Sequence, residues 1–212
     1  IVLVLLTRIL VLTRSRVEGG RLDAAHGVLL HIADAADHSS VRARTVVNCA
    51  GLGAQQLSRQ IVGVPQQSIP PRYLAKGHYF SLAGRAPFQR LVYPIAEAGG
   101  LGIHVTLDLS GRTRFGPDVQ WIEEVDYSFD ESRRDAFIKA IECYYPSLDA
   151  AQLQPSYTGI RPKISAPGRP DADFCIRGPK DHDGSAYVAL YGIESPGLTA
   201  SLALAEYVQT LL

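Results

Sequence analysis

The chain contains no methionine, one tryptophan and only three cysteines among its 212 residues. It begins with Ile1, and since methionine is absent throughout, we expect an internal start, so that the chain is a fragment of a longer protein. Cys49, Cys143 and Cys175 are odd in number and far apart, and no C-x-x-C pair occurs. This usage argues against a disulfide framework or a zinc site and fits a reducing compartment.

An excess of charge of one sign is also lacking, because 21 basic residues balance 21 acidic ones. Without a basic face, nucleic acid is not an expected partner. The apolar segment 1–12 is too short for a membrane span, is interrupted by Arg8, and is followed by no small-residue cleavage site. We therefore expect this segment to be a buried strand or helix of a larger domain.

Several catalytic and metal-binding motifs are missing. The chain has neither a G-x-S-x-G elbow nor a P-loop. The acidic and histidine residues of segments 34–38 and 181–183 lie in polar turns with no third ligand at metal spacing, so we expect no metal site there. What is present is an ordinary globular composition, 46% apolar and 20% charged, which can bury one sizeable core.

Hydrophobic periodicity predicts the elements of the first third of the chain. We expect strands over residues 11–17, 27–33 and 41–50, turns over 18–20 and 34–40, and a helix over 54–61. The unbroken apolar run within Thr45–Ala50 is typical of a strand that is buried on both faces, as in a parallel sheet.

The composition changes over residues 64–71, where three prolines mark a crossing from one domain to the next. Beyond it, alternating segments separated by turns predict an antiparallel sheet, over 75–82, 91–95, 101–109 and 113–115. An amphipathic helix is expected over 130–145, capped by Asp130 and ended by Pro146. Further strands are expected over 157–164 and 186–191, before a final helix over 196–211.

This order of elements predicts an α/β (α+β) fold in which the chain leaves one domain, builds a second, and returns. We expect the first domain over residues 1–64, an antiparallel-sheet domain with its helix over 65–155, and the return strands and C-terminal helix over 156–212. A parallel sheet in the first domain would make it Rossmann-like.

The junction that follows the strand over 186–191 is the first candidate site. Ser195, Pro196 and Gly197 form a turn that we expect to open the final helix, with Ser195 as N-cap and Pro196 as the first helical residue. A helix start presents unpaired N–H groups and positive dipole charge, and Gly197 allows a flat ligand to approach the backbone.

A second junction follows the strand that ends at Ala50. Gly51 and Gly53 resemble part of a dinucleotide-binding loop, but Gln56 stands where a third glycine is needed, and no acidic residue follows at ribose-binding distance. We therefore exclude a nicotinamide site. A flavin-contacting turn and a plain strand-to-helix turn of small residues both remain open.

Polar residues in the second domain suggest an anion-binding pocket. Arg161 offers a planar fork that matches a carboxylate, although a surface arginine before a proline is also possible, and Lys163 shares its strand face. His104, in an otherwise apolar strand, is either a general base or a half-buried, satisfied histidine. Lys76 and His78 alternate on a strand and share a face, either in the pocket or at an exposed sheet edge.

Taken together, these segments resemble FAD-dependent oxidoreductases of the D-amino-acid oxidase superfamily, and within it the L-2-hydroxyglutarate dehydrogenase/oxidase group. The resemblance covers nearly all of residues 10–212 and rests on motifs in the family's order. They are TVVNCAGLG (45–53), KGHYF (76–80), VYPI (92–95), GIHVT (102–106), RFGPD (114–118), YTGIRPK (157–163) and YGIESPGLT (191–199).

The resemblance implies FAD as the cofactor and assigns roles to residues. Arg161 would hold the substrate carboxylate, and the pocket would include Lys163, Lys76, His78 and Tyr93. The residues that would contact FAD are Ala50, Gly51, Leu52, Gly192, Ser195, Pro196, Gly197, Leu198 and Thr199. The family's N-terminal strand with its G-x-G-x-x-G fingerprint is absent from this sequence, so we expect the first domain to be a partial FAD-binding domain that binds FAD poorly by itself.

The expected reaction is FAD-dependent oxidation of a 2-hydroxy acid, with L-2-hydroxyglutarate as the expected substrate, to the 2-oxo acid. His104 and Arg161 are the expected catalytic residues. Alternatives are an amino-acid or glycerol-3-phosphate flavoenzyme, and a truncated inactive remnant or interaction module. The electron acceptor, oxygen or quinone, stays open. The expected location is cytoplasmic, with peripheral contact with the inner membrane as an open alternative.

Overall fold

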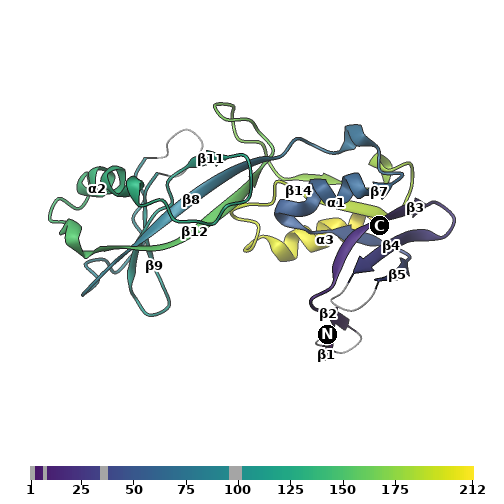
Figure 1. Cartoon of the computed structure of the whole chain (residues 1–212), viewed down its shortest axis with the longest axis horizontal. Coiled ribbons are helices and arrows are strands. Elements are labelled where there is room, and N and C mark those ends of the chain that lie inside the picture. The colour runs from purple at the N-terminus through teal and green to yellow at the C-terminus, as the bar shows by residue number, and fades with distance from the viewer. Residues whose placement is uncertain (1–2, 7–8, 34–37, 96–101) are drawn as a thin grey trace. The chain divides into compact units, whose positions relative to one another are not determined.

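A computed structural model describes residues 3–6, 9–33, 38–95 and 102–212 of the chain (Figure 1). The chain divides into two compact units, unit 1 comprising Ile1–Pro71 and Asp173–Leu212 and unit 2 comprising Arg72–Ala172. The boundaries differ from the expected 64/65 and 155/156. The second one moves because β12 (Leu153–Lys163) pairs along its length with β8 (Tyr73–Leu82) and so belongs to the antiparallel sheet.

The described residues of unit 1 form three sheets. In one, β14 (Tyr187–Tyr191) pairs in parallel with β6 (Val46–Asn48) and antiparallel with β13 (Cys175–Arg177). The other sheets have the strand orders β5-β4-β3-β7 and β1-β2. Their strands are β1 (Leu3–Leu6), β2 (Ile9–Leu12), β3 (Arg16–Asp23), β4 (Gly27–Ala33), β5 (His38–Ala43) and β7 (Ile61–Val62).

The helices of unit 1 are α1 (Ala54–Gln60) and α3 (Ser201–Leu211), with short 3-10 turns at Gly51–Gly53, Gln66–Ser68 and Pro179–Asp181. Val208 of α3 packs in a small core with Val188 and Leu190 of β14. The parallel pairing of β6 with β14 supplies the Rossmann-like feature expected of this part of the chain.

Unit 2 is built on a five-stranded sheet with the order β11-β8-β10-β9, in which β12 also pairs with β8. Its other strands are β9 (Val105–Leu107), β10 (Thr113–Phe115) and β11 (Gln120–Ile122). Helix α2 (Arg134–Glu142) follows a 3-10 turn over Glu131–Arg133, and a second such turn spans Ala150–Gln152. The two long strands β8 and β12 run side by side in Figure 1.

The core of unit 2 lies between the sheet and α2. Phe137 and Ile141, one turn apart on α2, are fully buried against Phe80 of β8 and Phe115 of β10. Truncating a buried phenylalanine costs about 3–5 kcal/mol, so this cluster stabilises the sheet that carries the candidate site. Asp130 caps the turn before α2, since its carboxylate accepts a hydrogen bond from the Ser132 N–H.

The final helix begins at Ser201 and not at Pro196, so the expected cap at Ser195 is wrong. Gly197 N–H donates to the Glu194 carbonyl and Thr199 Oγ1 donates to the Pro196 carbonyl, and these bonds form a turn in place of the first helical turn. The helix dipole therefore starts at the residues after this turn.

Two other local expectations are wrong. Segment 41–50 is split between β5 and β6 in different sheets, and Val47 is 40% exposed, so the run is not buried on both faces. The expected turn at 18–20 lies inside β3. A Cβ on Gly20 would lie 2.1 Å from the Leu29 carbonyl oxygen, so this glycine permits close strand pairing there and makes no turn.

Other differences are matters of extent. His104 comes directly before β9 and not within a strand, and of segment 91–95 only Val92 pairs, with Val105. The expected turn over 34–40 lies partly outside the described residues, and β5 begins at His38. Of the helices that the structure describes, none has both the length and the apolar character needed to cross a membrane.

Candidate functional site

The register of β8 against β12 assigns the candidate residues of unit 2 to two faces. Arg161 pairs with Ala75, and Tyr157 pairs with Tyr79. Paired residues on antiparallel strands project to the same side, and neighbours along a strand project to opposite sides. Arg161, Tyr157 and Tyr79 therefore share one side of the sheet, which we call the Arg161 face. Lys76 and His78 belong to the other side.

Aromatic side chains accompany Arg161 on its face. The rings of Tyr79 and Tyr157 stack with their centroids 4.4 Å apart and their planes 12° apart. Burial, then the neighbouring Tyr157, raises the pKa of Tyr79 to about 12, while the Arg161 guanidinium opposes the shift. Tyr79 therefore stays protonated near neutral pH and can donate a hydrogen bond. A Cβ on Gly159, two residues before Arg161 and on the same side of the sheet, would meet nothing within 4 Å, so there is open space at Gly159.

The charge of Arg161 also acts on His104. Burial first, and then the charge of Arg161, lower the His104 pKa from its ordinary value of 6.5, although the Gly102 carbonyl opposes this. Nδ1 lies 3.1 Å from the Gly102 carbonyl oxygen, which can only accept, so Nδ1 carries the proton. Nε2 then keeps its lone pair, as a general base requires. The ring stacks on Tyr93 at a centroid distance of 4.4 Å, so Tyr93 lies beside His104 as the pocket hypothesis needs.

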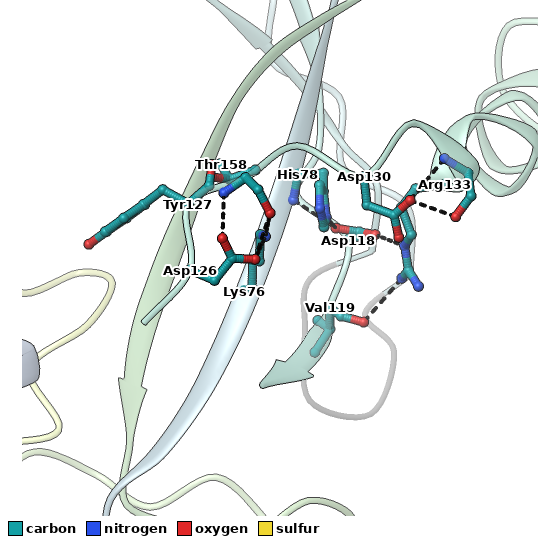
Figure 2. A network of polar contacts seen from close by, with 11 residues as sticks. Lys76, His78, Asp118, Val119, Asp126, Tyr127, Asp130, Arg133 and Thr158 are labelled. Carbon is teal, nitrogen blue, oxygen red and sulfur yellow. Dashed lines mark hydrogen bonds and ion pairs between the residues drawn. The ribbon is translucent and has the colours of Figure 1, made fainter. Parts of the chain in front are cut away.

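Lys76 and His78 are interior residues and not members of an exposed sheet edge, because β8 has paired strands on both sides. Lys76 is 2% exposed and its Nζ lies 2.9 Å from Asp126 Oδ2. His78 is fully buried and its Nδ1 lies 3.0 Å from Asp118 Oδ1 (Figure 2). The structure thus separates both residues from Arg161, on the opposite face, and pairs each with a carboxylate.

Asp118 is the centre of the network on that second face. Its Oδ1 accepts from the His78 backbone N–H at 2.7 Å, and its Oδ2 accepts from Arg133 Nε at 2.7 Å (Figure 2). Arg133 also donates to the Val119 carbonyl. The Asp126 pKa is held well below its usual range by hydrogen bonds from Ser128 and then from Lys76. These contacts fasten β8 and indicate a structural role for this face.

Lys163 shares the strand parity of Arg161, as expected, but its ammonium is engaged. Nζ lies 2.8 Å from Asp171 Oδ1, and the residue is buried. Its assignment as a second carboxylate ligand would require that ion pair to open.

In unit 1, a buried polar network shapes the turn at Ala50, Gly51 and Leu52. Asn48 Oδ1 accepts from the Ala50 N–H at 3.0 Å, and Asn48 Nδ2 donates to the Ala54 carbonyl oxygen, Ser58 Oγ and Tyr187 Oη at 2.9–3.1 Å. The network joins the end of β6 to α1 and β14. It holds Gly51 at a φ of +54°, with nothing within 4 Å of where a Cβ would lie.

The two expected FAD-contacting segments meet at one cavity of about 490 Å³ in unit 1. Gly51 and Gly197 both line it, together with Ile193 and residues of β6, β14 and α3. Ser195, Pro196, Leu198 and Thr199 border a neighbouring hollow with Gly197, and Gly192 adopts a φ of +68° directly before them. Bare glycine backbone and apolar walls fit a flat ring system such as the flavin.

Sequence reasoning missed two residues of the Arg161 face. Tyr157 and Arg114 come together there, with the Arg114 guanidinium carbon 5.5 Å from the Tyr157 ring centroid. The alternation of β10 and β12 contained this information, but the pairing register, including a bulge between Pro155 and Tyr157, was needed to use it. Among the described residues, no cluster of three or more histidine, cysteine or acidic side chains could hold a metal ion.

Comparison with known proteins identifies the class to which this arrangement belongs. Residues 8–211 match the family model described as FAD dependent oxidoreductase, and the chain belongs to that family. It is 48% identical over 175 residues to a protein named mitochondrial L-2-hydroxyglutarate dehydrogenase from Arabidopsis thaliana, which covers 77% of this chain and 36% of that protein. It is also 26% identical to a glycerol 3-phosphate dehydrogenase from Caloramator mitchellensis, over 79% of this chain and 33% of that one.

Solved structures agree on the fold. The L-alpha-glycerophosphate oxidase from Mycoplasma pneumoniae, solved with FAD bound, superposes with a TM-score of 0.75 at 22% identity, covering 93% of this chain and 50% of that one. Glycine oxidase from Bacillus cereus gives a TM-score of 0.64 at 15% identity, covering 93% and 49%. The chain thus spans about a third of the curated relatives and half of these structures.

Proposed function

We propose that the Arg161 face binds a 2-hydroxy acid, with L-2-hydroxyglutarate as the substrate, for FAD-dependent oxidation to the 2-oxo acid. The observation that carries the proposal is that Tyr79 shares a side of the sheet with Arg161 and that Arg161 acts on both Tyr79 and His104, with open space at Gly159. The 48% identity to an L-2-hydroxyglutarate dehydrogenase supports this choice of substrate.

The roles follow from the chemistry of each group. The Arg161 guanidinium binds the substrate carboxylate through two parallel hydrogen bonds, and the protonated Tyr79 hydroxyl adds a donor. His104 Nε2 accepts the proton of the 2-hydroxyl group, because its lowered pKa keeps the ring neutral at physiological pH. When FAD is bound, it supplies the redox chemistry by accepting the hydride released as the substrate C–H bond breaks.

The segments proposed to contact FAD are those at the unit 1 cavity, Ala50–Leu52 and Gly192–Thr199. They present backbone with small or no side chains at Gly51 and Gly197. The electron acceptor remains open between oxygen and quinone. A cytoplasmic location, with peripheral contact with the inner membrane as the alternative, stays a prediction, and the Arabidopsis relative is named mitochondrial.

Glycerol 3-phosphate is a second candidate substrate, favoured by the Caloramator relative and by the anion-binding character of Arg161. The two candidates are distinguished by the bleaching of oxidised flavin under anaerobic conditions. The chain is incubated with FAD and then with L-2-hydroxyglutarate, its D-enantiomer or glycerol 3-phosphate.

Where the chain retains added flavin, we expect bleaching by the L-hydroxy acid alone, and its loss in Arg161→Gln. Bleaching by glycerol 3-phosphate alone would transfer the proposal to that substrate. Should the chain retain no flavin, binding of the product 2-oxo acid to the chain and its loss in Arg161→Gln test the carboxylate site directly.

A further inference from the structure

Arg114 is a second guanidinium on the Arg161 face. On β10, Arg114 pairs with Ser81 of β8, whereas the next residue, Phe115, pairs with Phe80 in the buried core. Because alternate residues project to opposite sides, Arg114 projects to the same side as Tyr79 and Arg161. The register therefore presents two permanently charged forks on one face of the sheet.

The stacked tyrosines connect the two guanidiniums. The Arg114 guanidinium carbon lies 5.5 Å from the Tyr157 ring centroid, Tyr157 stacks on Tyr79 at 4.4 Å, and Tyr79 interacts with Arg161. Arg161 is four residues beyond Tyr157 on β12, a Cα separation of about 13 Å. Their pairing partners on β8, Ser81 for Arg114 and Ala75 for Arg161, are six residues apart, about 20 Å along the sheet. Two arginine side chains extended toward each other would span much of that separation, and a short acyclic diacid could bridge the rest with its methylene groups over the rings.

The charge balance at Arg114 favours an additional anion. Asp108 Oδ2 accepts from Arg114 Nη2 at 3.1 Å and from Arg112 Nε at 3.0 Å, so one carboxylate serves two cations. A guanidinium has five N–H donors, and among the residues that the structure describes no acceptor besides Asp108 contacts Arg114. Cation–aromatic contact with Tyr157 orients the remaining donors without neutralising their charge.

From these contacts we propose that Arg114 determines specificity by binding the second carboxylate of a dicarboxylate substrate, while Arg161 binds the carboxylate next to the reacting carbon. The proposal rests on the proposed function, and it explains how the site distinguishes a five-carbon diacid from a monocarboxylic 2-hydroxy acid. Removing the Arg114 guanidinium leaves one substrate charge unpaired, which weakens the binding of the diacid but not that of a monocarboxylic acid.

The test uses binding to the complete 212-residue chain, measured by calorimetry. The ligands are 2-oxoglutarate, a diacid, and 2-oxobutyrate, which lacks the second carboxylate. We expect Arg114→Gln to weaken the binding of 2-oxoglutarate by about tenfold, the effect of losing one charge-assisted hydrogen bond. The affinity for 2-oxobutyrate should change by less than about twofold. Arg112→Gln is the matched control. It also removes a guanidinium that pairs with Asp108, but it leaves the Arg114–Tyr157 contact in place.

The outcomes separate this inference from the proposed function. In one outcome Arg161→Gln weakens the binding of both ligands, while Arg114→Gln weakens the binding of neither ligand or of both equally. Arg114 is then not the specificity residue, and the carboxylate site at Arg161 stands. If Arg161→Gln changes neither ligand, or the unsubstituted chain binds neither, both proposals fail. Should Arg114→Gln not fold, as judged by circular dichroism, Arg114→Lys keeps the charge without the fork, and we expect it to lose part of the preference for the diacid.

Discussion

At the scale of single residues, the proposed chemistry depends on the protonation state of His104. The Gly102 carbonyl fixes the proton on Nδ1, and burial followed by the charge of Arg161 keeps the ring neutral. A histidine in this state accepts a proton at Nε2 over a wider acidic range than a free imidazole does. His104 thus has the tautomer that a base needs, and its lowered pKa keeps Nε2 unprotonated near neutral pH.

The first prediction concerns the His104 titration. We expect its pKa to lie below 6.5, and Arg161→Gln to raise it, since the neutral residue no longer disfavours the imidazolium. Because the unfolded chain binds this proton more readily, acidification below the ordinary histidine pKa also destabilises the fold. NMR of the imidazole protons measures the His104 pKa in the unsubstituted chain and in Arg161→Gln.

A His104 pKa at or above 6.5, or one that is unchanged by Arg161→Gln, would contradict the assignment of His104 as a neutral base beside Arg161.

The individual candidate residues could be predicted to different extents. The segment around Arg161 was recognisable because a guanidinium before proline follows a motif of the family, and His104 stood out in an apolar segment. Tyr157 and Arg114 were not recognisable, since their importance comes from cross-strand register, which one sequence does not reveal. The strand that carries Lys76 and His78 could be predicted, but their ion pairs could not, because the partners Asp126 and Asp118 are 40–50 residues away in the sequence.

At the scale of elements, β8 has a different role on each side. Toward Arg161 it contributes Tyr79, and on its other side Lys76 and His78 bind acidic residues. Asp118 reaches the β8 backbone as well as the His78 ring, so it positions the strand on which Tyr79 is carried.

The second prediction concerns the contribution of the Asp118 hydrogen bonds to stability. We expect Asp118→Ala to lower the free energy of unfolding by about 3 kcal/mol, because it removes three hydrogen bonds and leaves the donors of His78 and Arg133 unpaired. Urea denaturation measures the change. Glu123→Gln, at an exposed position outside the network, is the control and should change stability by less than about 0.5 kcal/mol. Equal effects of the two substitutions would show that the network contributes little.

The third prediction concerns the turn before α3. A Cβ on Gly197 would lie 2.5 Å from Ile193 Cγ2 and 2.7 Å from the Glu194 carbonyl oxygen, so Gly197→Ala must move the turn. We expect weaker FAD binding, measured by quenching of flavin fluorescence. Gly53→Ala is the control, because its Cβ would approach only Ala50 Cβ, at 3.9 Å. FAD affinity that is identical in both variants would remove Gly197 from the proposed contact set.

Elements with clear periodicity were the ones that could be predicted. The strand over 27–33 and the strand over 113–115 were expected with the bounds that the structure has. The start of α3 was not, because Ser-Pro-Gly is compatible with both a helix start and a turn, and backbone hydrogen bonds to Glu194 and Pro196 select the turn. The glycines of β3 resemble a turn in the sequence, because the close contacts with Leu29 and Gln60 that require them are non-local.

At the scale of the whole molecule, the chain builds unit 1 from two separate segments and inserts unit 2 between them. This interrupted order was predictable from the proline-rich crossing and the change from apolar runs to alternating segments. The second boundary was misplaced because residues 156–163 read as a returning strand, while their pairing with β8 keeps them in unit 2. The family match over residues 8–211 covers both units.

We propose above all that unit 2 binds a carboxylate on the Arg161 face and not on the Lys76–His78 face. The most direct measurement is chemical-shift mapping by NMR, in which 2-oxoglutarate is added to the isotope-labelled chain. The account predicts that resonances of Tyr79, His104, Gly159 and Arg161 shift in a saturable way and no longer do so in Arg161→Gln. Shifts confined to Lys76, His78 and their acidic partners, or no saturable shift on either face, would contradict it.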